Sequence, residues 1–313
     1  MIGAAPQRPA LWLRLWQYQA ERFPLLQHGM LIAAFTFSAA AYSRMCRGVG
    51  GFVGWTDFGF GVFVTLSLFA LVRLFDEFKD HADDVRFRSY LPVPRGLVSL
   101  RELGYVAGGL ITLQVLAVAL WQPSLFPLYA LALGYLLLMR VEFFVPEWLK
   151  ARHLLYIASH MVIIPLIDLY ASGLDWRLAG AAPHAGLIWF FAVSFANGIV
   201  LEFGRKLRVP ATEEAGVLSY TKYFGPRGGV VAWLIVLLIT LSLAVGAAQY
   251  AGYGILAAGW LVGFFLLCAA PGLLFLRAPS ARLTRYIEYA SGLWTIGMYL
   301  SLGALPLLKN FWL

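Results

Sequence analysis

Acidic residues gather in one short stretch of this sequence. Five of the 16 acidic residues fall within nine positions, at Asp76, Glu77, Asp80, Asp83 and Asp84. Asp76, Asp80 and Asp84 follow one another at intervals of four residues, which predicts three carboxylates on one face of a helix. Because like charges in a row repel, this arrangement favours a bound cation, and carboxylate oxygens suit Mg²⁺ shared with phosphate groups. The alternative is a solvated helix end whose acids are neutralised by nearby arginines.

A basic loop with two prolines follows the acidic stretch. Arg86, Arg88 and Arg95 lie around Pro92 and Pro94, and the two prolines restrict the backbone to an extended turn. The guanidinium group presents paired donors that suit phosphate oxygens. Taken alone, however, these arginines are equally typical of the basic charge found beside membranes.

A second polar cluster ends a strongly apolar run farther along the chain. It consists of Asn197, Glu202, Arg205, Lys206 and Arg208. Ionisable groups within an apolar span are candidates for function, because burying them in lipid is unfavourable. Glu202 and Lys206 lie four residues apart, so an ion pair within one helix is the alternative.

The preceding apolar run, 153–172, contains three further polar residues, His153, His160 and Asp168. His160 is a candidate for proton transfer, although a single histidine in a helix bundle is more often only hydrogen-bonded. Arg140 and Glu142, just before this run, are expected at the membrane interface.

The composition shows what kind of element must position these groups. Of the 313 residues, 61% are hydrophobic and only 13% are charged, whereas a soluble domain has about 25% charged residues. This chain lacks the charge to cover a soluble surface of its size. The composition therefore argues against a soluble enzyme, a disordered protein and a coiled coil, and favours a polytopic membrane protein.

A membrane-spanning helix needs about 20 largely apolar residues. Strands of a barrel would be about half as long and would alternate in polarity, so helices are favoured. Nine stretches qualify, and they are 29–46, 56–78, 104–121, 125–145, 153–172, 185–204, 229–250, 253–276 and 286–308. The predicted fold is an all-α bundle of nine transmembrane helices.

The basic residues predict how this bundle is oriented. With the N-terminus inside, 19 of the 24 basic residues fall in inner segments, four fall in outer segments, and Arg73 lies within the second span. This asymmetry predicts a cytoplasmic N-terminus and an outer C-terminus, in a bacterial inner membrane or its equivalent. The net charge of +8 is then a sign of topology. We expect membrane lipid as a partner and no nucleic acid, since no basic stripe carries interleaved aromatic residues.

The chain is expected to divide into two parts. Residues 1–28 carry Arg8, Arg14 and Arg22 among leucines and tryptophans, without the pattern of a signal peptide, which predicts an amphipathic cytoplasmic arm. Residues 29–313 form the transmembrane domain. Cys46 and Cys268 lie far apart in apolar surroundings, which excludes a disulfide framework and a cysteine-based zinc site.

Together these motifs resemble the UbiA superfamily of intramembrane prenyltransferases. That family carries Asn-Asp-x-x-Asp-x-x-x-Asp at the inner end of helix two, then an Arg-Pro-x-Pro-x-Gly loop, and commonly Asp-x-x-x-Asp at the end of helix six. The first motif is matched by the stretch from Asp76 to Asp84, with Glu77 in the first Asp position. The loop is matched from Leu91 to Gly96, with Leu91 where the family usually has Arg. The second motif is matched by Glu202-Phe203-Gly204-Arg205-Lys206, with a lysine in the second Asp position.

The resemblance implies a function, a cofactor and a set of site residues. The fold would surround a lipid-accessible central cavity, and the activity would be Mg²⁺-dependent transfer of a prenyl group from an isoprenyl diphosphate to an aromatic or lipid-like acceptor, which the sequence does not identify. Asp76, Asp80 and Asp84 would bind Mg²⁺, and Glu202 would contact a second Mg²⁺ or its water. The implied catalytic residues are these same four. The residues expected to bind the diphosphate are Arg88, Arg95, Arg205, Lys206 and Arg208.

The departures from the family motifs leave alternatives open. Lys206 in an acidic position suggests a one-metal variant in which the ammonium group replaces the second cation. Because Leu91 stands where the family has Arg, Arg88 or Arg95 would bind the diphosphate in its place. A second enzyme hypothesis is intramembrane terpene cyclisation. A hypothesis from another class is a transporter or lipid-binding membrane protein, although transporters tend to place charges near the midplane rather than at helix ends.

Overall fold

The computed structural model describes residues 8–213 and 219–312, and this part of the chain is helical with no strand. The long helices are α2 (Leu25–Cys46), α3 (Trp55–Lys79), α5 (Leu100–Trp121), α6 (Phe126–Arg140), α9 (Ile163–Trp176), α10 (Leu187–Lys206), α12 (Pro226–Tyr250), α13 (Gly254–Arg277) and α14 (Ala281–Trp312). The short elements are α1 (Leu11–Arg22), α4 (His81–Phe87), α7 (Pro146–Lys150), α8 (His153–Met161) and α11 (Tyr220–Phe224), with 3₁₀ turns η1 (Pro123–Leu125), η2 (Glu142–Phe144) and η3 (Pro210–Thr212). The prediction of an all-α fold is confirmed.

The number of membrane-spanning helices agrees closely with the expected nine. In the described part of the chain, eight helical segments are long and apolar enough to cross a membrane. The ninth expected stretch, 286–308, lies within α14, which has 32 residues. The chain is therefore an integral membrane protein with several spans.

Two expected spans differ from the observed helices for local reasons. The stretch 153–172 is divided into α8 and α9 around Val162. Pro165 explains this break, because proline has no N–H and its ring clashes with the carbonyl of the residue four positions earlier, Met161. The stretch 125–145 ends as a helix at Arg140, because residues 142–144 of η2 have positive φ angles of 49°, 54° and 62°.

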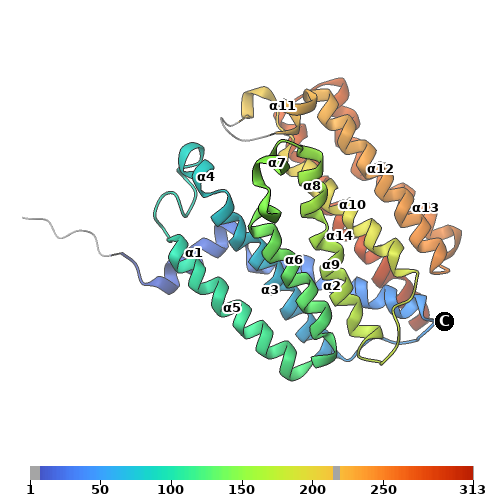
Figure 1. Cartoon of the computed structure of the whole chain (residues 1–313). Coiled ribbons are helices and arrows are strands. Elements are labelled where there is room, and N and C mark those ends of the chain that lie inside the picture. The colour runs from blue at the N-terminus through green and yellow to red at the C-terminus, as the bar shows by residue number, and fades with distance from the viewer. Residues whose placement is uncertain (1–7, 214–218, 313) are drawn as a thin grey trace, which may run out of the picture.

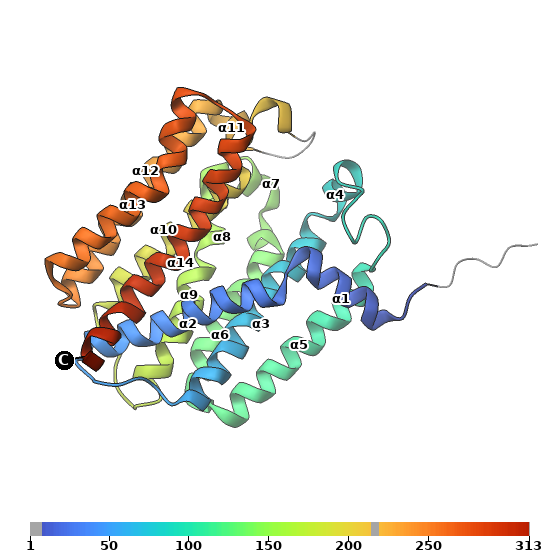
Figure 2. The same cartoon turned by 180° about the vertical axis from the view of Figure 1, so that it is seen from behind.

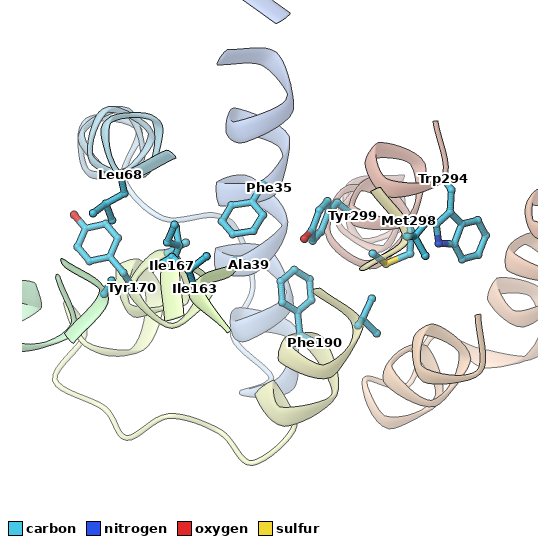
Figure 3. Close-up of a cluster of buried hydrophobic side chains, with 14 of the residues drawn as sticks. Phe35, Ala39, Leu68, Ile163, Ile167, Tyr170, Phe190, Trp294, Met298 and Tyr299 are labelled. Atoms are coloured by element: carbon cyan, nitrogen blue, oxygen red, sulfur yellow. The ribbon is translucent and has the colours of Figure 1, made fainter. Parts of the chain in front are cut away.

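Four helices form the centre of the bundle. α2 packs against α9 and α14, and α10 packs against both α9 and α14. α3 and α6 lie against α9 on one side, with α5 beside α3, while α12 and α13 cover α10 and α14 on the other (Figures 1 and 2). Figure 3 shows aromatic and aliphatic side chains meeting between these helices. Those buried to 3% exposure or less include Phe35, Ala39, Leu68, Ile163, Ile167, Tyr170, Phe190, Trp294, Met298 and Tyr299.

The N-terminal helix α1 is attached to the bundle by polar contacts. Its Arg14 pairs with Glu102 at the start of α5, with 2.6 Å between Nη2 and Oε1. Glu102 also closes a capping box with Ser99, which satisfies free N–H groups at the first turn of α5. Trp12 and Trp16 of α1 remain exposed, at 68% and 66%. The division at residue 28 into an arm and a membrane domain stays a prediction.

α3 and α10 end on the same side of the bundle. The short helices α4, α7 and α11 lie on that side in both views (Figures 1 and 2). We call this side the motif end, since Lys79 and Lys206, the last residues of α3 and α10, lie there together with the two predicted motifs. The prediction that the motif end faces the cytoplasm concerns orientation and stays a prediction.

Candidate active site

The first acidic motif crosses a break between two helices. α3 ends at Lys79 and α4 begins at His81, so the expectation of one continuous helical face for Asp76, Asp80 and Asp84 is wrong. Asp80, the residue at the break, has φ −93° and ψ 2°. The i,i+4 backbone bonds nevertheless continue, because Asp80 N donates to Asp76 O and Asp84 N donates to Asp80 O, each at 2.9 Å. The three acids thus keep their helical spacing across a bend.

Glu77 is buried and hydrogen-bonded by side chains of α1 and α3. It is 1% exposed, and its Oε1 accepts hydrogen bonds at 2.7 Å from Arg22 Nε of α1 and at 2.7 Å from Arg73 Nη2 of α3. Tyr18 Oη donates to the same oxygen at 3.4 Å. A buried carboxylate held by two guanidinium groups fixes α1 to α3, which explains how Glu77 can occupy a motif position while serving the packing of α1.

Asp80 lies at the centre of the acidic motif and has no ion-pair partner among the described residues. Burial raises the pKa of Asp80 to about 6. Lys79 and Arg88 lower this pKa, while the negative charges of Asp76 and Asp84 raise it further. A carboxylate with so little compensating positive charge is a suitable ligand for an added cation.

Asp76 and Asp84, on either side of Asp80, are paired with basic residues. Asp76 has two loose partners, Arg73 and Lys79, each at 3.5 Å. Asp84 is 2% exposed, and its Oδ1 lies 2.5 Å from Arg88 Nη2. Burial raises the pKa of Asp84, and the positive charge of Arg88 opposes that rise.

The basic loop contains two arginines that were predicted to bind diphosphate, Arg88 and Arg95. They form ion pairs with different acids. Arg88 stays beside the acidic motif through Asp84. Arg95 instead pairs with Glu21 of α1, with Nη2–Oε1 at 2.7 Å, and donates to the Tyr90 carbonyl. This pairing lowers the pKa of Glu21, because Arg95 donates hydrogen bonds to the carboxylate. The structure therefore places Arg88, but not Arg95, at the acids.

The second motif forms a compact charge cluster at the end of α10. Glu202 pairs within the helix with Arg205 at 2.6 Å and with Lys206 at 2.5 Å, as the alternative from spacing predicted. Its side chain is 12% exposed, whereas that of Arg205 is 61% exposed. Arg208 lies past the helix and approaches Glu288 of α14, with Nη1–Oε2 at 3.9 Å. Arg208 thus pairs loosely with α14 and not with Glu202.

The two motifs approach each other across the motif end. Arg205 of α10 lies within electrostatic range of Asp76 of α3. Two segments far apart in the chain therefore contribute opposite charges to one region. Carboxylates on α3 and an exposed guanidinium group on α10 are the kinds of group that bind Mg²⁺ and phosphate oxygens.

A buried network lies next to Asp76, and no sequence motif indicates it. Lys79 Nζ donates to Tyr156 Oη at 2.7 Å and lies 3.6 Å from Glu142 Oε1. Glu142, which was expected at the interface, is 5% exposed, and its Oε2 lies 3.3 Å from His160 Nε2. Burial raises the pKa of Glu142, but the His160 and Lys79 contacts outweigh it and lower this pKa overall. Local patterns cannot signal these contacts, because α3, η2 and α8 meet only after folding.

The residues at the motif end fit Mg²⁺ by their chemistry. Asp76, Asp80 and Asp84 supply hard carboxylate oxygens, and Asp80 forms no ion pair among the described residues. Among the described residues, however, no group of three or more His, Cys, Asp or Glu side chains stands close enough to hold a metal ion. Mg²⁺ usually retains water and shares its coordination with phosphate oxygens, so one or two carboxylates suffice. The donor set suits an ion that arrives with a diphosphate.

A cavity of about 530 Å³ lies elsewhere at the motif end. It lies beside the connection between α11 and α12 and the connection between α13 and α14. The lining residues are Val209, Pro210, Phe224, Gly225, Pro226, Arg227, Gly228 and Pro279. None of the predicted site residues lines it, and the expected central cavity stays a prediction.

Comparison with known proteins relates this arrangement to a fold. No protein-family model matches the chain, and no curated protein matches it. The apo structure of a UbiA homolog from Aeropyrum pernix K1 is similar, with a TM-score of 0.65 and 17% identity over 92% of this chain and 98% of that one. A structure of digeranylgeranylglyceryl phosphate synthase is also similar, with a TM-score of 0.61 and 11% identity over 94% of this chain and all of that one.

These comparisons identify the class of protein by its architecture. The chain is an all-helical, multi-span membrane protein with the fold of the UbiA homolog. The resemblance predicted from the two motifs is therefore confirmed at the level of the fold. Identities of 17% and 11% do not carry activity or site residues over to this chain.

Proposed function

We propose that this protein is a Mg²⁺-dependent intramembrane prenyltransferase that uses an isoprenyl diphosphate. The observation that supports the proposal most strongly is the convergence of the α3 and α10 motifs. Asp76 and Arg205, one from each motif, interact electrostatically at one end of a bundle with the fold of the UbiA homolog. Solved proteins of that fold include a digeranylgeranylglyceryl phosphate synthase.

The proposed roles follow from the charge and exposure of each side chain. Asp76, Asp80 and Asp84, which continue the helical backbone bonds across the bend, are the proposed Mg²⁺ ligands. One or two of them would contact the ion directly, and diphosphate oxygens and water would complete its coordination. Arg205 would contact the diphosphate directly, because its side chain is 61% exposed. Bound Mg²⁺ would supply positive charge to the diphosphate oxygens, which stabilises this leaving group.

The other residues proposed to bind diphosphate already form ion pairs with acidic side chains. Lys206 is paired with Glu202, and Arg88 is paired with Asp84, so each would exchange a carboxylate for a phosphate oxygen. Glu202 would hold the basic pair of α10 in position and, if a second metal binds, would contact that metal or its water. Arg95 and Arg208 would need to leave Glu21 and Glu288 to reach the diphosphate.

The bundle interior suits the hydrocarbon part of the substrate. Phe35 of α2 makes edge contacts with Phe69 and Tyr299, at ring-centroid distances of 5.5 and 5.3 Å. Aromatic faces stabilise a cation that forms in a dry environment. A prenyl group that leaves diphosphate at the motif end would therefore be kept from water until the acceptor attacks.

Measurement of diphosphate release tests the proposal. Purified protein is incubated with geranyl, farnesyl or geranylgeranyl diphosphate in Mg²⁺, with and without a panel of aromatic and lipid-like acceptors. We expect release with at least one substrate, and none after Mg²⁺ is removed with EDTA. Release that yields cyclic hydrocarbons without any acceptor would indicate the cyclase alternative. Failure of every substrate to release diphosphate would contradict both enzyme hypotheses and favour a lipid-binding or transport role.

A further inference from the structure

Another group of buried polar residues lies inside the bundle. It comprises Asp168 of α9, Ser194 and Asn197 of α10, and Tyr299 of α14, which are 0%, 0%, 1% and 3% exposed. Asn197 and Ser194 precede Glu202 by five and eight residues on the same helix. At 1.5 Å per helical residue, these two side chains lie about 7–12 Å deeper in the bundle than the second motif. We call these four residues the inner polar cluster.

Three central helices bring the inner polar cluster together. Asp168 lies close to Ser194, and Tyr299 lies close to Ser194, Asn197 and Asp168. These side chains interact, but Asp168, Ser194 and Asn197 lack the geometry of full hydrogen bonds. Tyr299 reaches from α14 toward α2 and α10 (Figure 3), where its ring lies 5.3 Å from that of Phe35. The ring of Tyr299 thus packs on Phe35, and all four members of the group are closed off from water.

The hydrogen-bonding capacity of the inner polar cluster is largely unused. Both carboxylate oxygens of Asp168, the hydroxyl of Ser194 and both amide atoms of Asn197 are buried without a hydrogen-bond partner of good geometry. Leaving such groups unpaired in a low-dielectric interior is unfavourable, and buried polar atoms in native proteins nearly always have partners. A bound species that contacts several of these atoms would remove this penalty.

Asp168 also lacks a positive partner. Among the described residues, no basic side chain pairs with it or affects it electrostatically. Asp175, seven residues later on the same helix, shows the contrast, because it pairs with Arg44 at 3.2 Å and Arg47 at 2.9 Å. An isolated carboxylate inside a membrane protein must be neutralised by a proton or by a bound cation.

We propose that the inner polar cluster binds a dehydrated monovalent metal cation. Asp168, Ser194 and Asn197 provide several hard oxygen atoms at one place, which suits such an ion. One carboxylate balances one positive charge, whereas a divalent ion would leave a net charge in a low-dielectric interior. A proton alone would neutralise Asp168 but would not improve the poor hydrogen-bond geometry at the Asn197 amide. This site shares no residue with the acidic motif of α3 or with residues 202–206 of α10.

Thermal unfolding in different salts tests the proposed site. The full-length protein in detergent is heated in choline chloride that is replaced stepwise by LiCl, NaCl or KCl at constant ionic strength. Binding to the folded state should raise the Tm of the wild type by about 2–4 °C with at least one cation, and the rise should saturate. Asp168→Asn and Asn197→Leu should each abolish the rise.

A matched control separates ion binding from a general decrease in stability. Asp175→Asn removes the paired carboxylate of the same helix, so it should lower the Tm while retaining the cation-dependent rise. Equilibrium dialysis with the stabilising cation should give about one ion per chain for the wild type and Asp175→Asn, and none for Asp168→Asn. The proposal is overturned if no cation gives a saturable rise, or if Asp168→Asn retains the wild-type rise.

Discussion

Glu77 and Asp80 lie three residues apart at the end of α3, but their surroundings differ in charge. Glu77 is enclosed by Arg22, Arg73 and Tyr18, whereas Asp80 has no ion-pair partner among the described residues. A buried carboxylate enclosed by two guanidinium groups serves packing, and one without an ion-pair partner can accept a cation. The environment, and not the order along the motif, therefore separates a structural acid from a candidate ligand.

At the residue scale, Asp175 provides a test of buried ion pairing. It is 2% exposed and contacts Arg44, Arg47 and Ser43, with Ser43 Oγ donating at 2.8 Å. Asp175→Asn leaves two partly buried guanidinium groups without their charge partner. We expect the free energy of unfolding to fall by about 2–3 kcal/mol, at the lower end of such effects because the arginines retain some solvent contact.

Equilibrium unfolding of the detergent-solubilised protein measures this change. Asp57→Asn is the control, since Asp57 accepts one hydrogen bond from Gln122 and forms no ion pair in the described part of the chain. A decrease in stability in Asp175→Asn no larger than that in Asp57→Asn would show that the α2–α9 ion pairs contribute little.

At the scale of elements, a buried ion pair joins α1 to α3, and an exposed ion pair joins α1 to the basic loop. Glu77, with Arg22, is buried, while Glu21 and Arg95 are each 35% exposed. Because exposed pairs contribute little, Glu77→Gln should loosen α1 far more than Glu21→Gln does. Limited trypsin digestion should therefore cleave after Arg22 several-fold faster in Glu77→Gln than in the wild type. Equal cleavage rates in the two variants would contradict this attribution.

The helices themselves were largely predictable from the sequence, for a physical reason. A span must present about 20 apolar residues to lipid, and this requirement is local. The break at Val162 also has a local cause in Pro165. The positive φ angles at residues 142–144 have no comparable signal, since none of these residues is glycine. Glu142, the first of them, contacts Lys79 and His160, which lie far from it in the sequence.

The sequence predicted which residues belong to the candidate site better than it predicted the ion pairs that they form. Spacing placed Glu202 beside Lys206, because residues four apart share a helix face. Spacing does not report that Arg95 would turn to Glu21, since that contact joins residues 74 positions apart. The inner polar cluster likewise joins α9, α10 and α14, and only folding brings Asp168 near Ser194.

At the scale of the whole molecule, the distribution of basic charge predicts orientation. Ser89, in the loop at the motif end, and Ala182, in the connection at the opposite end, are both exposed. In intact cells, a membrane-impermeant maleimide should label Ala182→Cys but not Ser89→Cys. Both variants should react once the membrane is permeabilised. Labelling of Ser89→Cys alone in intact cells would place the motif end outside and reverse the predicted orientation.

The site at the motif end can be tested with one pair of acids three positions apart. Asp80 lies at the bend without an ion-pair partner in the described chain, while Asp83 is exposed on α4. Asp80→Asn and Asp83→Asn each remove one negative charge, so the net charge of the protein changes equally in the two variants. The measurement is the rate of Mg²⁺-dependent diphosphate release from the allylic diphosphate that the wild type uses. We predict a decrease of at least about 100-fold in Asp80→Asn and a rate within about twofold of the wild type in Asp83→Asn. Similar rates in both variants would contradict a magnesium–diphosphate site at the end of α3.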